Sequence, residues 1–522
     1  MSLFPMNLRG MRVLLVQIGA ASVAAVLVAG CGSNYRPVVT PINPSGPPAQ
    51  PQSTVTVVSS PSTTAPGIAT IIDYSGDTIV ASASIGPGPL TFTLDESGST
   101  GYTYNSDGTV TNFTATSSLR SDPSHVTYST LPSNAQPVGL FSPVAGLWVA
   151  DLTGNVVDVM TASPETFKLA IPVAPTPVAI TGLYSGTQHY YALSLNTTGT
   201  APGNALQYSD MTCNTDPSSV TQTGEADAME IASYSVSARI PLGKCPVYAV
   251  SSNDGRRLFV MNRGSDTITV INSQFDTLDS CTPFTNQSGR AVTCHPCLPL
   301  TASAVVPGNG SSPTSCAQQA GSTLATTAHA GPVYAEFNIA TSQLVVADYD
   351  GGTISVIDVS LDEYGNDSPT FGTTYTIKVG NTATPNPASV TVLYDGSRAY
   401  TANQNDGTGN GTVTIVNLSS HTVEKTLDVV GHPRTVVSTS NSLYGKVYVG
   451  APDTPYLTIL RTDQDIVDTT VLVQGNVVDV RTAGQNGSNG NVNIMSRRPG
   501  AGTPCYLPGA AAEASLAACQ TQ

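Results

Sequence analysis

Two cysteines spaced as Cys294-His295-Pro296-Cys297 form the arrangement in this chain that is best suited to redox chemistry. Two intervening residues can lower the pKa of one thiol, which is what a redox pair requires. The same cysteines could instead form structural disulfides with Cys281 and Cys316, or share zinc with them as four thiolates. Because an oxidising compartment favours disulfides, we interpret the cluster as structural. Leu298 stands where a haem attachment motif has histidine, which excludes covalent haem.

Eight cysteines remain when Cys31, which belongs to the N-terminal signal described below, is set aside. An even number of cysteines in an exported protein indicates a disulfide framework. We expect Cys213 to bond with Cys245, Cys505 to bond with Cys519, and the four clustered cysteines to bond among themselves. The eight are Cys213, Cys245, Cys281, Cys294, Cys297, Cys316, Cys505 and Cys519.

Candidate acid–base residues are few and scattered. No two of the six histidines have the short spacing of a metal-binding helix. Glu336, Arg434 and His432 lie close to the starts of the β units described below, where a catalytic centre could form. These three are weak catalytic candidates, and the alternative is that they are ordinary polar residues of a loop or a channel mouth.

Two segments could supply oxygen ligands to calcium, namely Asp348-Tyr349-Asp350-Gly351 and Asn403-Gln404-Asn405-Asp406-Gly407. Both lack the length and the bidentate glutamate of a twelve-residue calcium loop. We therefore interpret both segments as turns, and the sequence predicts neither a metal nor a cofactor.

The elements that position these residues come from an internal repeat. Sixteen residues separate Pro246 from Asn262, and the same spacing recurs in two later units. Each unit continues with a β-branched run such as Thr353-Ile354-Ser355-Val356-Ile357-Asp358. Weaker copies begin at Pro89, Pro137, Pro177 and Pro433, and the shortest intervals between starts are 40, 46 and 48 residues. Such a period is typical of one four-stranded propeller blade.

Each unit is predicted to contain four short strands. An apolar strand follows the proline, and a tight turn leads to a second strand of the Leu-Phe-Val type. The second strand ends in Asn or Asp, whose side chain we expect to satisfy turn amides. A β-branched third strand and a polar outer strand such as 422–427 complete the unit. One such sheet cannot cover both of its faces, so the units must stack around an axis.

These residues resemble the YVTN-type β-propeller repeats of bacterial and archaeal surface proteins. The resemblance is specific over about 246–429 and fainter across 67–498, and it implies an all-β propeller that is usually seven-bladed. Seven proline starts are present, with strand-like segments left over at both ends. Segments 476–481 and 491–495 read as two inner strands, and 69–73 and 77–81 as their outer pair. Pairing the first strands with the last would close the ring, so we predict eight blades, with seven as the alternative.

Several enzyme classes are excluded by missing motifs. Propeller dehydrogenases that use pyrroloquinoline quinone stack several tryptophans, but Trp148 is the only tryptophan. The chain also lacks the sialidase repeat, a Gly-x-Ser-x-Gly nucleophile elbow and a phosphate-binding glycine loop. Lactonase propellers share this repeat style without a short signature, so the resemblance leaves that activity open.

Composition narrows the classes of partner. Only 11% of the 522 residues are charged, compared with about 25% in an ordinary soluble domain. The 20 basic residues are outnumbered by 35 acidic ones, giving a formal net charge of −15. A nucleic-acid surface needs clustered Lys and Arg, so nucleic acid is excluded as a partner.

The N-terminus predicts export and lipid anchoring. Arg9 and Arg12 precede an apolar run from Val13 to Ala29, which is followed by Gly30 and Cys31. The end of this run resembles a bacterial lipobox, which implies cleavage before Cys31 and acylation of its thiol; an uncleaved membrane span is the alternative. We expect the following domains: the signal at 1–31, a Pro/Ser/Thr-rich tether at 32–66, the propeller at 67–500 with a cysteine-rich insertion at about 275–328, and a C-terminal tail at 501–522.

The leading functional hypothesis is a monomeric, lipid-anchored, extracytoplasmic propeller that binds an envelope protein or glycan through its rim loops. The outer membrane is favoured, because Gly32 carries no acidic retention signal of the enterobacterial kind. The alternatives are a lactonase-like hydrolase that uses the central channel and a redox module built on Cys294 and Cys297. An enzyme should gather ionisable residues with perturbed pKa values around one pocket.

Overall fold

The computed structural model describes residues 54–482, with gaps at 74–75, 96–97, 143–145, 153, 162–164, 183–188, 197–221, 253–254, 287, 301–314, 320–328, 363, 406–408 and 440–444. These residues belong to one compact unit, Pro47–Gln522. A second unit, Met1–Gly46, lies outside the described residues, as do Cys31, Cys213, Cys505 and Cys519.

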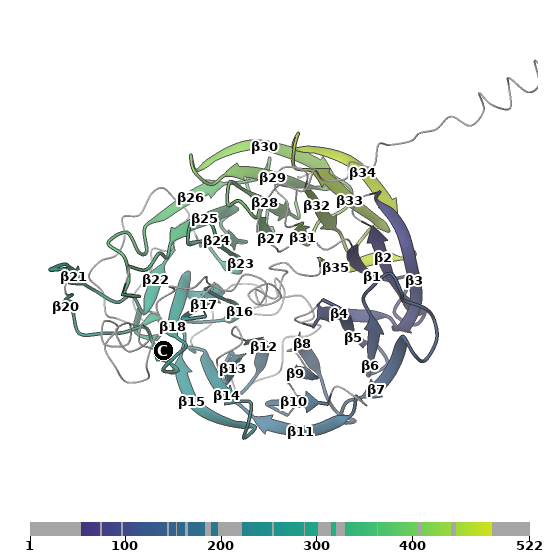
Figure 1. The fold of residues 1–522 in the computed structure, drawn as a ribbon, viewed down its shortest axis with the longest axis horizontal. Helices are drawn as coiled ribbons and strands as arrows, with labels where there is room; N and C mark the ends of the chain where they lie inside the picture. Colours follow the sequence, from purple (N-terminus) through teal and green to yellow (C-terminus); the bar gives the residue numbers. More distant parts are fainter. Residues whose placement is uncertain are drawn as a thin grey trace, which may run out of the picture. The chain divides into compact units, whose positions relative to one another are not determined.

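Eight four-stranded antiparallel sheets surround a common axis, each with its first strand innermost (Figure 1). We number these sheets as blades 1 to 8. Blade 1 contains β35 (Asn476–Thr482), β1 (Thr54–Ser60), β2 (Pro66–Asp73) and β3 (Thr78–Pro87); blade 2 contains β4 (Pro89–Leu94), β5 (Thr100–Asn105), β6 (Thr109–Thr114) and β7 (Val126–Thr130); blade 3 contains β8 (Pro137–Phe141), β9 (Leu147–Asp151), β10 (Val156–Met160) and β11 (Phe167–Pro172); blade 4 contains β12 (Pro177–Gly182), β13 (His189–Ser194), β14 (Glu225–Glu230) and β15 (Ser235–Pro241).

The second half of the ring continues the same order. Blade 5 contains β16 (Pro246–Ser251), β17 (Arg257–Asn262), β18 (Thr267–Asn272) and β19 (Thr277–Leu278), with η2 (Arg263–Ser265) between β17 and β18; blade 6 contains β23 (Pro332–Asn338), β24 (Gln343–Asp348), β25 (Thr353–Asp358) and β26 (Thr374–Lys378); blade 7 contains β27 (Pro387–Val392), β28 (Arg398–Asn403), β29 (Gly411–Asn417) and β30 (Thr422–Val429); blade 8 contains β31 (Thr435–Ser438), β32 (Lys446–Gly450), β33 (Tyr456–Arg461) and β34 (Ile466–Leu472).

The ring is closed. Each innermost strand contacts the innermost strand of the next blade, and β35 contacts both β31 and β4. Strand β35 pairs antiparallel with β1, with Val480 opposite Val57. The prediction of a propeller closed by its terminal strands is therefore confirmed, and the number of blades is eight.

Two details of the predicted closure are wrong. Three strands of blade 1 come from the N-terminal side and one from the C-terminal side, rather than two from each. The additional N-terminal strand is β1, which lies inside the segment 32–66 assigned to the tether. Val55, Val57 and Val58 are fully buried there, and this hydrophobic burial stabilises the segment as a strand. The prolines and serines around it had indicated an extended tether instead. The other predicted inner strand, 491–495, lies outside the described residues.

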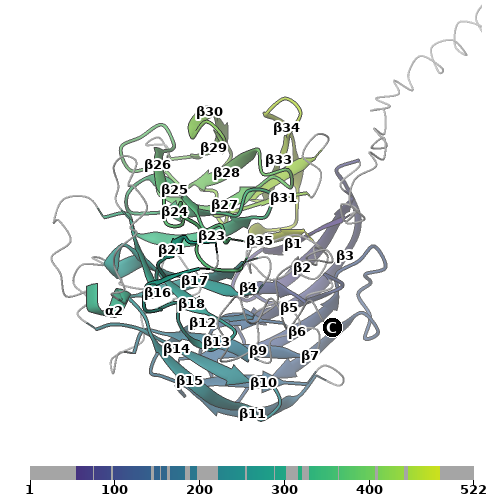
Figure 2. The ribbon, with the colours of Figure 1, turned by 60° about the vertical axis from the view of Figure 1, so that its left-hand side comes forward.

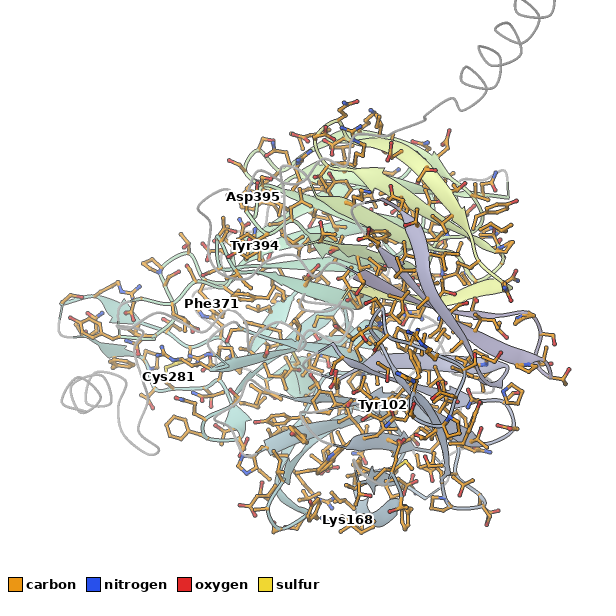
Figure 3. All side chains as sticks on the ribbon, turned by 45° about the vertical axis from the view of Figure 1, so that its right-hand side comes forward. Tyr102, Lys168, Cys281, Phe371, Tyr394 and Asp395 are labelled. Carbon is orange, nitrogen blue, oxygen red and sulfur yellow. A yellow bond between two sulfur atoms is a disulfide. The ribbon has the colours of Figure 1, made fainter. Side chains whose placement is uncertain are left out.

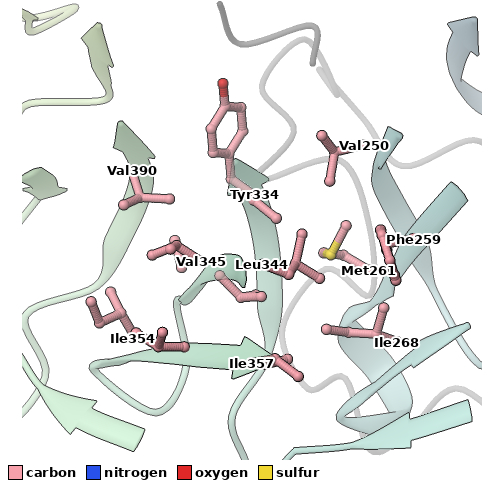
Figure 4. Packing of buried hydrophobic residues seen from close by; sticks show 14 of the residues in the cluster. Val250, Phe259, Met261, Ile268, Tyr334, Leu344, Val345, Ile354, Ile357 and Val390 are labelled. Atoms are coloured by element: carbon pink, nitrogen blue, oxygen red, sulfur yellow. The ribbon is translucent and has the colours of Figure 1, made fainter. Parts of the chain in front are cut away.

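The core lies between the blades. Figure 4 shows Ile357 of blade 6 facing blade 5, where Ile268 lies, while Val345 and Ile354, on the opposite face of the same sheet, lie toward Val390 of blade 7. Val345, Ile354 and Ile357 are fully buried, and burying such a side chain contributes about 2 kcal/mol. This packing explains the repeat, because the β-branched second and third strands of each unit are needed to fill the space against its neighbours.

An insertion interrupts the outermost strand of blade 5. Strand β19 and strand β22 (Cys297–Pro299) both pair with β18, at opposite ends of it. Between them the chain leaves the sheet as residues 279–296, which we call the arm. The arm carries the short strands β20 (Phe284–Thr285) and β21 (Ala291–Val292), which lie outside the ring in Figure 1, and the chain continues to helix α2 (Cys316–Gln319), seen in Figure 2.

Among the residues described, none forms a helix long and apolar enough to cross a membrane.

Candidate functional site

Glu336, a predicted catalytic candidate, lies on the innermost strand of blade 6. Its side chain is nearly buried, with 4% exposed, and its Oε2 accepts a 2.7 Å hydrogen bond from the backbone N–H of Val392 in blade 7. A carboxylate that accepts a buried backbone N–H satisfies a donor that would otherwise be costly to bury. Glu336 therefore ties blade 6 to blade 7.

Arg434, the second candidate, makes the corresponding connection farther round the ring. Its Nη2 donates to the carbonyl of Val478 in blade 1 at 2.9 Å. Its own carbonyl accepts from the hydroxyl of Ser389 in blade 7 at 2.8 Å. Glu336 and Arg434 stand on blades that are separated by blade 7, and the structure does not bring them together in one centre.

His432, the third candidate, lies in the connection between β30 and the innermost strand β31. Nearly half of its side chain is exposed, and its Nδ1 lies 2.6 Å from Oδ2 of Asp453. The carboxylate of Asp453 also accepts the backbone N–H of His432, which together with the imidazole lowers the pKa of Asp453 despite its partial burial. This pair fixes the loop before β31.

Four further residues gather at the innermost strands. Asp479 and Arg481 form a buried pair on β35, with Nε of Arg481 2.9 Å from Oδ2 of Asp479. Arg481 also donates to the carbonyl of Phe92 in blade 2 at 3.3 Å. The rings of Tyr248 in blade 5 and Tyr334 in blade 6 stack with their centroids 4.5 Å apart. Burial alone would lower the pKa of Arg481, but the charge of Asp479 and, to a smaller extent, the two tyrosine hydroxyls raise it.

Sequence reasoning missed this group of Asp479, Arg481, Tyr248 and Tyr334, although the segment 476–481 was identified as an inner strand. The available signal was two opposite charges at alternate positions of an otherwise apolar strand, which places both on the same face. The tyrosines also had a signal, because Tyr248 and Tyr334 each lie two residues after the proline that begins the unit.

A second polar group lies on the rim where blades 5 and 6 meet. We call Arg263, Asp266, His329, Tyr349 and Asp350 the rim cluster. Arg263 pairs with Asp350 through Nε and Nη2 at 2.9 and 2.8 Å, and its guanidinium lies over the ring of Tyr349 at 5.1 Å.

His329 completes the rim cluster. Its Nδ1 lies 2.9 Å from Oδ2 of Asp266, and 35% of its side chain is exposed. Burial raises the pKa of Asp266, against the opposing effects of the Gly331 N–H and of His329. Among the charged groups of the cluster, the imidazole is the most exposed, whereas only 11% of the Arg263 side chain is exposed.

The described side chains of the segments considered for calcium form hydrogen bonds or ion pairs within the fold, whereas Asp406 and Gly407 lie outside the described residues. Asp348 Oδ2 accepts from the hydroxyls of Ser355 and Thr353 at 2.7 and 3.1 Å, and Asp350 pairs with Arg263. Asn403 donates to the hydroxyls of two threonines of the next strand. No group of three or more His, Cys, Asp or Glu side chains within the described ranges could hold a metal ion.

The four clustered cysteines form two disulfides, Cys281–Cys294 and Cys297–Cys316. Cys294 and Cys297 are therefore not bonded to each other, and each is joined to a cysteine outside the motif, as the structural interpretation requires. Cys245 is disulfide-bonded as well, and its expected partner Cys213 lies outside the described residues.

Comparison with known proteins supports the fold and assigns no function. No protein-family model matches the chain, and no curated protein matches it in sequence. A crystal structure of AztD from Citrobacter koseri aligns with a TM-score of 0.50 at 11% identity, covering 83% of this chain and 97% of that one. Dihydro-heme d1 dehydrogenase NirN, solved in complex with DHE, aligns with a TM-score of 0.50 at 15% identity, covering 86% of this chain and 78% of that one. A candidate 6-phosphogluconolactonase from Bacteroides fragilis aligns with a TM-score of only 0.43 at 13% identity, covering 82% and 98% of the two chains.

Proposed function

We propose that this propeller is an extracytoplasmic binding module that takes a protein or glycan of the cell envelope on its rim. The observation that carries this proposal is that the charged residues at the innermost strands form structural contacts between blades. Glu336, Arg434 and Arg481 each hydrogen-bond to the backbone of the next blade, so they hold the ring together. A general acid or base must instead be able to reach a proton on a substrate.

The rim cluster is the proposed binding surface. It combines an aromatic ring with a cation, a carboxylate and an imidazole, and binding surfaces are commonly enriched in aromatic residues and arginine. The blades supply a rigid support, because the cluster spans two sheets that pack against each other.

The test is capture of a partner from envelope extracts with the propeller that lacks its lipid. We expect a macromolecule to co-purify, and the double variant Arg263→Ala, His329→Ala to reduce its capture at least tenfold. His125→Ala is the matched control, since His125 forms a similar pair with Asp122 in blade 2. Co-purification of no macromolecule, combined with turnover of a panel of lactones, contradicts the proposal and favours the hydrolase.

Lipid attachment at Cys31 is a separate part of the proposal. It is supported by the lipobox-like end of the apolar run and by the disulfides of the propeller, which are typical of exported proteins. We expect the natural chain to partition into the detergent phase of a Triton X-114 extract, and Cys31→Ser to abolish that partitioning. Equal partitioning of both chains would contradict acylation at Cys31.

A further inference from the structure

The two ends of the arm are both hydrogen-bonded to one residue of blade 5, Val270. The N–H of Asp279 donates to the carbonyl of Val270 at 2.9 Å, and the N–H of Val270 donates to the carbonyl of Pro296 at 3.0 Å. The disulfide Cys281–Cys294 closes the arm just beyond this base, and Cys297–Cys316 fastens the returning strand β22 to helix α2. The two disulfides therefore fix both sides of the short segment that holds His295.

A buried chain of charges extends from the base of the arm into blade 6. Nε of Arg257 lies 2.9 Å from Oδ2 of Asp279, and its Nη2 lies 3.5 Å from Oδ1 of Asp367. Oδ2 of Asp367 lies 2.7 Å from Nδ1 of His295. At most 5% of each of these four side chains is exposed. Asp367 belongs to the connection between β25 and β26, so the chain of charges joins the arm to both blades.

Two further contacts fasten the arm to the same connection in blade 6. Arg290, near the tip of the arm, forms an ion pair with Asp362 and donates to the carbonyl of Asp367 at 3.2 Å. The ring of His295 stacks on Phe371 at 5.2 Å. Figure 3 shows Cys281 and Phe371 on the same side of the ring.

The buried chain of charges is stable only as an assembled whole. Nε2 of His295 has no hydrogen-bond partner among the described residues, and removing one member of a buried ionic group leaves the others uncompensated. Burial raises the pKa of Asp279 to about 7. The positive charge of Arg257 acts to lower this pKa, and the negative charge of Asp367 acts to raise it. Loss of His295 from its place therefore weakens the outer connection between blades 5 and 6, because Asp367 loses one of its partners.

We propose that the arm is a thiol-sensitive clamp across the boundary of blades 5 and 6. With both disulfides formed, His295 is held against Asp367 and the clamp is closed. A dithiol reductant transfers two electrons and two protons to each disulfide, leaving two thiols per bond, and is itself oxidised to a disulfide. The freed segment then leaves Asp367, and the clamp opens while the ring stays folded. This property goes beyond rim binding and does not depend on it.

The test is carbethoxylation of histidines in the full chain, read out residue by residue by mass spectrometry. His295 is nearly buried and His432 is half exposed, yet both pair with an aspartate, so His432 is an internal reference. We expect dithiothreitol to raise modification of His295 at least tenfold relative to His432. Hydrogen exchange should increase in residues 279–296 and 359–373 and stay unchanged in blades 2, 3 and 8.

Cysteine variants identify the bond responsible. We expect Cys281→Ser with Cys294→Ser to open the clamp without reductant, and dithiothreitol to add no further change when Cys297→Ser and Cys316→Ser are also present. The latter condition separates the clamp from the disulfide of Cys245. Asp367→Asn, with all disulfides intact, should also expose His295. Unchanged protection of His295 on reduction overturns the proposal, as does an equal rise of exchange in all eight blades.

Discussion

At the scale of single residues, the position that ends the second strand of a blade has a repeated role. Asn403 donates from Nδ2 to the hydroxyls of Thr412 and Thr414 at 3.1 and 2.9 Å, and Thr414 accepts the N–H of Gly380 from the preceding blade. The side chain therefore bonds to hydroxyls of the third strand and, through Thr414, to the sheet of the preceding blade, rather than to the turn amides expected from the sequence. Blade 6 has Asp348 in this position.

Asp348 makes the position sensitive to pH. Complete burial raises its pKa to about 7, although the hydroxyls of Ser355 and Thr353 favour the ionised form. Because the pKa in the folded state is above that of the unfolded chain, the stability that protonation provides is present below about pH 4 and is lost as the pH rises through 7. An asparagine keeps the hydrogen bonds without titrating.

We therefore predict that the change in the free energy of unfolding caused by Asp348→Asn is roughly 3 kcal/mol more favourable to the folded state at pH 8 than at pH 4. Urea unfolding of both chains at the two pH values measures this difference. Asp395→Asn, on an exposed turn, serves as the control and should show no comparable difference. A variant that loses equal stability at both pH values would contradict the assignment.

A second residue-scale contact joins neighbouring blades. The hydroxyl of Tyr400 in blade 7 donates to Asp465 in the β33–β34 turn of blade 8, and Arg398 forms an ion pair with the same carboxylate. Tyr191 and His189 of blade 4 contact Asp276 of blade 5 in the same way. In both turns the aspartate has a positive φ of 52°, which aspartate tolerates better than most residues.

Tyr400→Phe should cost about 2 kcal/mol, because it removes a hydrogen bond to a charged group that is mostly buried. Thermal or urea unfolding measures the loss. Tyr128→Phe is the matched control, since 58% of Tyr128 is exposed, and it should change stability by less than about 0.5 kcal/mol. Equal effects of the two substitutions would show that the contact with Asp465 contributes nothing.

At the scale of elements, the outermost strands show how open edges are controlled. In five blades the register between the third and fourth strands shifts at one equivalent position, as between Ile415 and Val416. Such irregularities bend an edge strand and hinder its pairing with another chain. Blade 5 uses another solution, since β19 has only two residues and the arm follows it.

The element that closes the ring depends on one glycine. Gly475, with φ of +94°, directly precedes β35, and a Cβ there would lie 2.3 Å from the N of Pro61 and 2.4 Å from the C of Ser60. Both atoms belong to backbone that cannot move without shifting β1. Gly108 also has a positive φ, of +84°, but nothing lies within 4 Å of its Cβ position.

We predict that Gly475→Ala destabilises the protein by roughly 3 kcal/mol and Gly108→Ala by about 1 kcal/mol, because only the first adds a clash to the backbone strain. Urea unfolding gives the free energies, and hydrogen exchange should rise first in β1 and β35. Equal losses in the two variants would mean that the close approach at Gly475 is not a constraint.

Much of this architecture could be predicted from the sequence, because each strand carries its own pattern. The run Thr353–Asp358 coincides with β25, and the prolines at seven unit starts mark seven innermost strands. Strand β1 was missed, since its valines stand among prolines and serines that are typical of a tether. The role of Glu336 was also missed, because its partner Val392 is 56 residues away and only the closed ring brings them together.

At the scale of the whole molecule, the buried carboxyl groups make the folded protein more stable in mild acid than at alkaline pH. Burial raises the pKa of Asp158, Glu165, Asp279 and Asp348 to about 7 and that of Asp227 to about 6. All of these values are above those of the unfolded chain, so each group binds its proton more tightly when folded. Their combined contribution must fall as the pH rises from about 4 to 7.

We predict that the free energy of unfolding is at least roughly 3 kcal/mol higher at pH 5.5 than at pH 8.0. Urea unfolding under non-reducing conditions measures both values, with salt held constant so that screening of the net charge does not differ. A protein that is equally stable, or more stable, at pH 8.0 would contradict the prediction.

The pairing of β35 with β1 has a consequence for synthesis of the chain. A ribosome delivers β1, β2 and β3 first, and the strand that completes their sheet begins at Asn476, whereas β3 ends at Pro87. Until then, the backbone groups along one side of β1 have no permanent partner. Nascent chains that stop before residue 476 should therefore be the forms most prone to aggregate or to recruit a chaperone.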